Sequence, residues 1–202
     1  GQTDGDGTWG GDGLSFPRIQ GADPCGEVVA AGRGVGSDFL GRRVLADAWI
    51  RDPNDPEDRD GAGYLGSERD GGFAQFCSVP AVNVHPVDSS FSDVELASFP
   101  CSWSTAEHML TRSRLRAGET VVVTGASGGV GTALVQLAKV RAARVIAVAG
   151  AAKAGAVTAL GADAVVDRAV DDLAGAVAEA AGGPVDVLAD VVGGPAFAPL
   201  LE

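Results

Sequence analysis

Residues 119–131, ETVVVTGASGGVG, constrain the fold of this chain more than any other stretch. The valines at 121–123 form a short β-branched run, which is typical of a strand buried on both faces. The run stops at Gly125, and from Thr132 onward apolar residues recur at roughly helical spacing. The sequence therefore predicts a strand, a tight glycine turn and a helix, in that order.

A turn of this kind is suited to binding an anion. Glycines lack a Cβ, so the backbone can approach a diphosphate closely, and the free N–H groups and positive dipole end of the helix face it. The spacing is G-x-x-G-x-x-G with one further glycine inserted, which differs from the commoner G-x-G-x-x-G. The alternative is a glycine turn that merely permits close packing. The residues expected to hold the diphosphate are Gly125, Ser127, Gly128, Gly129, Val130 and Gly131.

The chain after this turn continues as a nucleotide-binding fold requires. Further apolar runs at residues 144–148, 163–166 and 185–192 are expected strands, and alanine-rich helical segments lie between them. Strands that alternate with helices predict a parallel sheet. We expect an α/β fold with a doubly wound Rossmann sheet that is incomplete, with about four strands where about six are usual. The chain is therefore expected to be a fragment, truncated at both ends, of a longer protein.

The residues after the second expected strand bear on the choice of dinucleotide. Proteins that prefer NAD usually carry Asp or Glu about 20 residues beyond the glycines, where it binds the ribose 2′-hydroxyl. Here residues 149–152 read AGAA and Lys153 follows. A 2′-phosphate would meet no carboxylate, and Lys153 supplies a positive charge. Gly150 and Lys153 are thus expected to contact NADP, the alternative being that Lys153 is only a solvated residue at a helix start.

The first part of the chain has a different character. Residues 26–32, 42–49, 73–79 and 81–87 read as strands of antiparallel β-structure, and 51–70 as a charged surface loop. Near Asp88 the pattern changes to helices. We therefore expect two domains, a β-rich one over residues 1–90 and a nucleotide-binding one over residues 91–202.

Composition restricts the partners of the protein. A net charge of −12 opposes binding to nucleic acid, because the phosphate attraction would be reversed in sign. No apolar run approaches the roughly 20 residues needed to cross a membrane. The cysteines, Cys25, Cys77 and Cys101, are odd in number and widely spaced, which argues against a disulfide framework. We expect a soluble, cytoplasmic protein that acts on a small molecule, without nucleic-acid or membrane partners.

Four segments, in this order along the chain, carry a resemblance to a known family: PRIQGADPCGEVVAAG, GGFAQFCSVPA, ELASFPCSWSTAEHML and GETVVVTGASGGVGTALVQLAK. In them the chain resembles the medium-chain dehydrogenase/reductase superfamily, and most of all its zinc-free quinone oxidoreductase branch, to which zeta-crystallin belongs. The resemblance extends from Pro17 to Glu202. It implies a partial GroES-like β domain followed by a partial Rossmann domain, NADP(H) in the cleft between them, hydride transfer, and a homodimer in the full-length protein.

The resemblance also indicates that zinc sites are absent. Zinc alcohol dehydrogenases of the superfamily have a Gly-His-Glu triplet where this chain reads Gly21, Ala22, Asp23, and alanine cannot ligate a metal. Cys101 matches a later ligand, but one thiolate with at most Asp23 does not complete the three protein ligands of a catalytic zinc. The four-cysteine structural lobe would fall in residues 51–70, which contain no cysteine.

The same resemblance suggests residues near the reacting ring. Thr105 matches a position close to the nicotinamide, and Val192 with Gly193 match the loop that meets its carboxamide side. By the same resemblance, Asp23 faces this cleft. Asp23 and Thr105 are the two candidate catalytic residues.

These observations favour an NADPH-dependent oxidoreductase that reduces quinones or other α,β-unsaturated carbonyls without catalytic zinc. An electron-poor quinone accepts hydride readily, so the protein contributes position and a dry cleft. His85 and His108 are expected to be structural or exposed. The alternatives are an alcohol dehydrogenase-like enzyme with a degenerate zinc site, or a non-catalytic nucleotide-binding protein.

Overall fold

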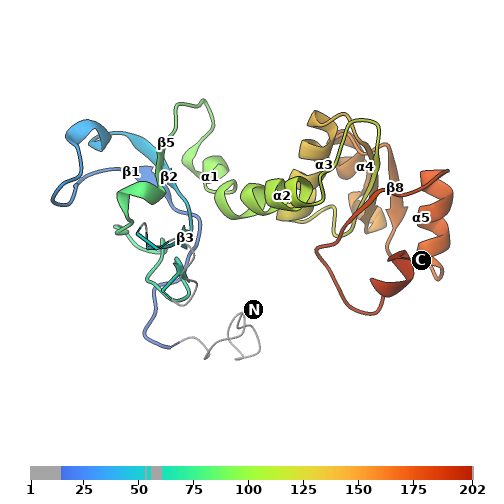
Figure 1. Ribbon diagram of the computed structural model, residues 1–202, viewed down its shortest axis with the longest axis horizontal. Coiled ribbons are helices and arrows are strands. Elements are labelled where there is room, and N and C mark those ends of the chain that lie inside the picture. Colours follow the sequence, from blue (N-terminus) through green and yellow to red (C-terminus); the bar gives the residue numbers. More distant parts are fainter. Residues whose placement is uncertain (1–14, 53, 56–60, 202) are drawn as a thin grey trace. The chain divides into compact units, whose positions relative to one another are not determined.

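The computed structural model describes residues 15–52, 54–55 and 61–201 of the chain (Figure 1). The chain divides into two compact units, a first unit Gly1–Cys101 and a second unit Ser102–Glu202. The first is β-rich and the second contains a parallel sheet with helices, so the α/β fold expected from the sequence is confirmed. The domain boundary at residue 90 stays a prediction. Within the described ranges, no helix combines the length and apolar character needed to cross a bilayer.

Short antiparallel strands form the first unit. The strands β1 (Cys25–Glu27), β2 (Arg43–Ala46) and β5 (Val84–Pro86) make a sheet in the order β1-β2-β5. A second ladder joins β3 (Trp49–Ile50) to β4 (Gly63–Tyr64). The expected antiparallel pairing in this region is therefore confirmed.

Several expected strands are shorter than the sequence pattern suggests. The strand expected over residues 26–32 ends at Glu27, and the one over 81–87 begins with a 3₁₀ turn. Asp47 divides the strand expected over 42–49, because its carboxylate accepts a hydrogen bond from the Trp49 N–H at 3.0 Å. The expected loop 51–70 contains β4, whose Tyr64 ring stacks against Trp49 with centroids 4.7 Å apart. Residues 53 and 56–60 of that loop lie outside the described ranges.

Residues 73–79 do not form a strand, so that prediction was wrong. A strand in the sheet would be expected to bury large apolar side chains of this run, but Phe73 and Phe76 are 80% and 74% exposed. The small core of this unit is made instead by Ala46, Ala48, Ile50 and Leu65. Only the start of the segment is paired, through the bond from the Phe73 N–H to the Gln20 carbonyl at 2.8 Å.

Two α-helices follow the β-structure, as the sequence predicts. Helix α1 (Asp93–Leu96) begins with a capping box, in which the Ser92 hydroxyl accepts from the Glu95 N–H and the Ser92 N–H donates to the Glu95 carboxylate. Helix α2 (Pro100–Arg112) begins at a proline, which suits a first turn because its missing N–H would be unpaired there. The 3₁₀ turns of the first unit are η1 (Ser37–Phe39) and η2 (Ala81–Asn83).

A four-stranded parallel sheet is the centre of the second unit. It contains β6 (Thr120–Val123), β7 (Arg144–Ala149), β8 (Ala164–Asp167) and β9 (Val187–Ala189), in the order β8-β7-β6-β9. All residues of β6 are buried, as its valine run predicts. The strand β9 is shorter than the expected run 185–192, because the chain turns away after Ala189.

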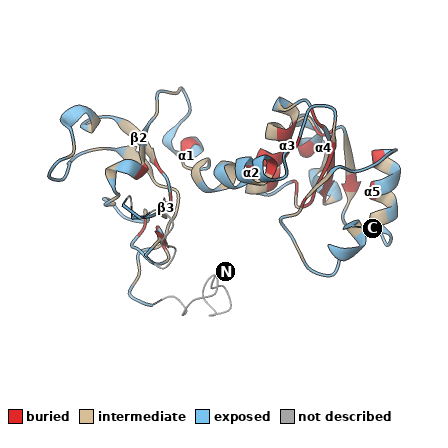
Figure 2. Cartoon of the chain, in the orientation of Figure 1, coloured by how far each residue is buried: buried red, intermediate tan, exposed pale blue. Residues whose placement is uncertain are grey.

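Helices cover both faces of this sheet. The helical elements are α3 (Gly129–Val140), η3 (Ala151–Lys153), α4 (Ala154–Ala159), α5 (Leu173–Ala181) and η4 (Ala198–Leu201). Val121 and Val123 share a core with Leu134 of α3, whereas Val122 packs with Val177 of α5 on the opposite face. Figure 1 shows α3 and α5 on either side of the strands, and Figure 2 shows the buried residues gathered between them. Successive residues of β6 thus point to opposite layers, as strand geometry requires.

Asp163 joins helix α3 to the sheet. Its carboxylate accepts hydrogen bonds from Lys139 Nζ at 2.8 and 3.0 Å and from the Val145 N–H at 2.7 Å. Burial opposes ionisation, but these bonds together outweigh it and hold the pKa of Asp163 below its ordinary value. The ionised carboxyl therefore stabilises the fold at neutral pH.

The stabilising effect of Asp163 should depend on pH. A carboxyl with a lowered folded-state pKa contributes stability above its unfolded-state pKa and loses it as pH falls through the folded value. We expect Asp163→Asn to lower the urea unfolding midpoint at neutral pH and to have little effect once acid protonates the wild-type carboxyl. Asp171→Asn, at an exposed position, serves as the control. A difference between wild type and Asp163→Asn that stayed constant with pH would contradict this assignment.

Helix α3 offers a direct test of the core. Leu134 is fully buried, so Leu134→Ala should lower the free energy of unfolding by about 2–5 kcal/mol through lost burial and the cavity left behind. Val140, on the same helix, is 82% exposed, and Val140→Ala should change stability by no more than about 0.5 kcal/mol. Urea unfolding followed by far-UV circular dichroism measures both. Equal losses in the two variants would rule out this packing of α3.

Candidate functional site

The turn after β6 is tied to both neighbouring strands. The Thr124 N–H donates to the Ala189 carbonyl of β9 at 3.2 Å, and the Ala126 N–H donates to the Val148 carbonyl of β7 at 3.1 Å. Between them Gly125 has φ +57°, a left-handed conformation that favours glycine. The turn therefore lies at the carboxyl edge of the sheet, held from both sides.

Gly131 lets the helix start directly against this turn. A Cβ placed on Gly131 would lie 2.2 Å from the Gly125 carbonyl oxygen and 2.7 Å from Ala126 Cα, which are backbone atoms that cannot swing away. The first turn of α3 consequently packs more closely on the strand end than any residue with a side chain would permit. This close approach supplies a packing reason for the glycine, in addition to any role in binding.

The first turn of α3 presents unpaired N–H groups. Gly128 is the N-cap, with extended backbone and no side-chain cap. Among the described residues, no protein group accepts a hydrogen bond from the amides of Gly129, Val130 or Gly131. Ser127, Gly128 and Gly129 are exposed. Unpaired amides at the positive end of a helix dipole favour an anion, and the binding of a diphosphate here stays a prediction.

A pocket of about 210 Å³ adjoins this turn. Gly125 and Ser127 form one side, Gly150 at the end of β7 forms another, and Val192 with Gly193 form a third. Apolar side chains complete the wall: Leu173, Phe197 and Leu200. The pocket therefore combines an apolar wall, suited to a flat ring, with polar backbone at the glycine turn.

Asp190, which the sequence analysis did not single out, organises the loop after β9. One carboxylate oxygen accepts a hydrogen bond from the Thr124 hydroxyl, and the other accepts from the Gly193 N–H at 2.7 Å. The Thr124 oxygen in turn accepts from the Val191 N–H at 3.1 Å. This network fixes the loop that carries Val192 beside the glycine turn. Its sequence signal is a polar residue directly after a strand of a parallel sheet.

The expected cofactor residues are distributed unevenly around the pocket. Gly125, Ser127, Gly150, Val192 and Gly193 line it, and residues 128–131 form the adjoining helix start. Lys153 is exposed in η3 and does not line the pocket.

Arg168, which the sequence analysis missed, supplies a positive charge on the pocket wall. The backbone N–H of Arg168 donates to the Ala149 carbonyl at 2.9 Å. A Cβ placed on Gly150 would lie 3.7 Å from the Nε atom of the Arg168 side chain. Arg168 directly follows β8, and this position at the carboxyl end of a strand is the sequence feature from which its place at the pocket could have been predicted. Two cationic side chains, Arg168 and Lys153, thus follow the ends of adjacent strands.

Asp23 lies in the first unit against the start of α2. Its carboxylate accepts a hydrogen bond from the Cys101 N–H at 2.6 Å. Burial raises the pKa of Asp23, and the bond from Cys101 acts in the opposite direction without cancelling that effect. Cys101, at the start of α2, is exposed. Among the described residues, no group of three or more His, Cys, Asp or Glu side chains is arranged to hold a metal ion.

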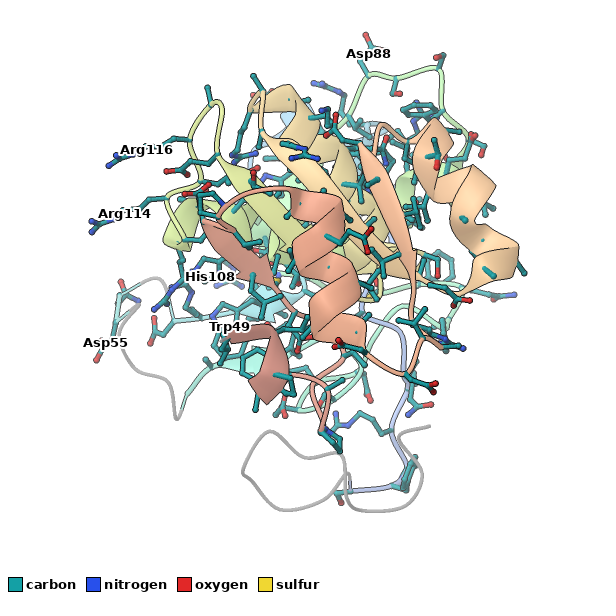
Figure 3. All side chains as sticks on the ribbon, turned by 90° about the vertical axis from the view of Figure 1, so that its right-hand side faces the viewer. Trp49, Asp55, Asp88, His108, Arg114 and Arg116 are labelled. Atoms are coloured by element: carbon teal, nitrogen blue, oxygen red, sulfur yellow. The ribbon has the colours of Figure 1, made fainter. Side chains whose placement is uncertain are left out.

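The other residues considered in the sequence analysis, Thr105, His85 and His108, lie on helix α2 or strand β5. Thr105 is exposed on α2, and its role near a nicotinamide stays a prediction, as does the catalytic role of Asp23. His85 in β5 and His108 in α2 are both exposed, and Figure 3 shows His108 pointing outward.

Two family models match the chain in sequence order. The alcohol dehydrogenase GroES-like domain matches residues 2–89, and the zinc-binding dehydrogenase matches residues 129–202. The chain belongs to the medium-chain dehydrogenase/reductase superfamily. Members of this superfamily bind a nicotinamide cofactor, and the anion site on α3 lies in the part of the chain that the second model covers.

The chain is also similar to individual members of the superfamily over most of its own length. An acryloyl-coenzyme A reductase from Metallosphaera sedula is 31% identical over 192 residues, which are 91% of this chain and 56% of the relative. A quinone oxidoreductase-like protein 2 homolog from Nematostella vectensis is 32% identical over 190 residues, 93% of this chain and 47% of the relative. The structure of a candidate alcohol dehydrogenase from Sinorhizobium meliloti has a TM-score of 0.85 and 52% identity, covering 93% of this chain and 52% of that one. The chain thus spans about half the length of these superfamily members.

Gly131 and Gly155 provide a matched test of the glycine turn. A methyl group on Gly131 would meet backbone atoms, so Gly131→Ala should lower the free energy of unfolding by about 1–3 kcal/mol. A Cβ on Gly155, inside α4, meets nothing within 4 Å, and Gly155→Ala should raise stability by about 0.5–1 kcal/mol. Urea unfolding distinguishes the two. Equal stability of Gly131→Ala and wild type would mean that α3 does not begin against Gly125.

Proposed function

We propose that the protein is an NADPH-dependent oxidoreductase that transfers hydride to quinones or other α,β-unsaturated carbonyl compounds without a catalytic zinc. The observation that carries this proposal is the set of unpaired amides on residues 129–131, next to a pocket with an apolar wall. The close contact of Gly131 with Gly125 brings the start of α3 directly onto the end of β6, so the unpaired amides lie beside the glycine turn.

Each part of the dinucleotide has residues suited to hold it. The amides of Gly129, Val130 and Gly131 would bind the diphosphate, and the apolar pocket wall would hold the adenine. Arg168, on that wall, and Lys153, on the segment after Gly150, would attract a 2′-phosphate. Residues 149–152 present no carboxylate that would repel it.

The proposed reaction is hydride transfer from the cofactor to an acceptor that needs little activation by the protein. A bound nicotinamide would supply the hydride, with Thr105, Val192 and Gly193 orienting the ring. Quinones and enones are electron-poor and accept hydride without strong polarisation of the carbonyl, which agrees with Ala22 in the place of a histidine ligand. The names of two relatives, an acryloyl-coenzyme A reductase and a quinone oxidoreductase-like protein, support this substrate class. A homodimer and a cytoplasmic location stay predictions.

The cofactor assignment is tested by titrating the protein with NADPH and NADH. We expect a clear preference for NADPH that shrinks by up to about fivefold in Lys153→Ala and again in Arg168→Ala, with NADH affinity unchanged, because each exposed cation contributes at most about 1 kcal/mol. Arg116→Ala is the control, since this exposed arginine precedes β6 at the opposite edge of the sheet (Figure 3). Equal affinities of the parent protein for the two dinucleotides would refute the assignment to NADP.

Activity and metal content separate the proposed enzyme from its alternatives. Oxidation of NADPH with a panel of quinones and enones, and less than stoichiometric zinc in the purified protein, is the expected result. Stoichiometric zinc would instead favour an alcohol dehydrogenase-like enzyme. Tight NADPH binding without turnover of any acceptor would indicate a non-catalytic nucleotide-binding protein.

A further inference from the structure

The side chain of Ser102 lies directly against the first turn of α3. A Cβ placed on Gly129 would come 2.6 Å from Ser102 Oγ and 3.5 Å from Ser102 Cβ. The two residues are on different helices, α2 and α3, within the second unit. This contact gives a reason for the additional glycine in the G-x-x-G-x-x-G sequence, because a Cβ at this position would displace the hydroxyl from its present place.

The hydroxyl of Ser102 is available to a ligand. It has no hydrogen-bond partner among the described residues, and Ser102 is only partly buried. It stands beside Gly129, which is exposed and whose N–H is also unpaired. A hydroxyl rotates freely to donate to an oxygen on either side. The start of α2 therefore places a hydroxyl beside the first turn of α3, whose amides are unpaired among the described residues.

We propose that Ser102 Oγ donates a hydrogen bond to the diphosphate of the dinucleotide, as a side-chain partner of the amides on α3. The inference rests on the proposed function and adds a ligand from a second helix. A phosphate oxygen that accepts from a backbone N–H keeps lone pairs for a further donor, and hydrogen bonds to charged acceptors are stronger than neutral ones. Ser102 also begins the turn of α2 that carries Thr105, so a bond here fixes that turn relative to the ligand.

A role in packing alone makes a different prediction. If Ser102 only filled space over Gly129, its removal would change the stability of the protein and would affect all adenosine ligands alike. If Ser102 binds the diphosphate, only ligands that contain a diphosphate lose affinity. Ligand selectivity therefore separates the two roles.

The experiment compares Ser102→Ala with Ser113→Ala in the full chain. Ser113 follows α2, and its hydroxyl donates to the Leu110 carbonyl at 3.1 Å, so it is a serine of similar surroundings without a place at the glycine turn. The ligands are NADPH and ADP-ribose, which contain the diphosphate, and adenosine 2′-monophosphate, which does not. We expect Ser102→Ala to weaken binding of the first two by about tenfold, as for a hydrogen bond to a charged group, and to leave the third unchanged.

The outcomes distinguish this inference from the proposed function. Wild-type protein that binds neither NADPH nor ADP-ribose would overturn both. Wild-type binding with undiminished affinity of Ser102→Ala for ADP-ribose would overturn the role of Ser102 alone. An equal loss for adenosine 2′-monophosphate would do the same, because it would show a general effect on the site.

A double-mutant cycle tests the contact itself. The methyl group of Gly129→Ala would force Ser102 Oγ to rotate away, so this variant should also lose about tenfold in ADP-ribose affinity. With Ser102→Ala already present, Gly129→Ala should have little further effect on affinity. Losses that add in the double variant would show that the two residues act independently and would overturn the proposed pairing.

Discussion

The close contact between Gly131 and the Gly125 carbonyl is the constraint on which the second unit depends. Because a helix begins directly on a strand end, its first amides cannot be covered by a preceding turn or a capping side chain. Such amides are costly to bury without partners, and here the helix start is exposed at Gly128 and Gly129, next to a pocket. The same packing that orders α3 against the sheet thus leaves its first amides without protein partners among the described residues. Stability and binding capacity come from one feature of the backbone.

Strand order then determines what surrounds that site. The strand β6 lies between β7 and β9. The loops that follow β6 and β9 therefore lead to opposite sides of the sheet, and a crevice can form between them at the carboxyl edge. The bonds from the Thr124 hydroxyl and the Gly193 N–H to Asp190 hold one of these loops in place. Residues far apart in the sequence meet here only because their strands are neighbours. This explains why Asp190 and Arg168 were not found from the sequence, although both directly follow strands.

The sequence predicted the second unit well and the first unit poorly, for a physical reason. A buried parallel strand such as β6 needs apolar residues on both faces, and this produces a continuous valine run that little else imitates. The first unit has short strands and a small core, so an alternating pattern carries less information. Residues 73–79 form an apolar run of the length of a strand, yet Phe73 and Phe76 remain exposed. Tyr64 shows the opposite error, since its pairing with Trp49 places a short strand inside an apparent loop.

The proposed anion site lies on a chain whose net charge is −12, and local geometry reduces the effect of that charge at the glycine turn. Charges on the exposed surface are screened over about 8 Å at physiological salt, so most of the excess acid does not reach the glycine turn. The carboxylate closest to the pocket, that of Asp190, accepts hydrogen bonds from Thr124 and Gly193, which disperse its charge. The dipole of α3 and the guanidinium of Arg168 favour an anion at short range. A polyanion that spans tens of ångströms would still meet the acidic surface, whereas a single diphosphate meets only this turn. At the proposed site, this charge distribution would favour a small anion over an extended one.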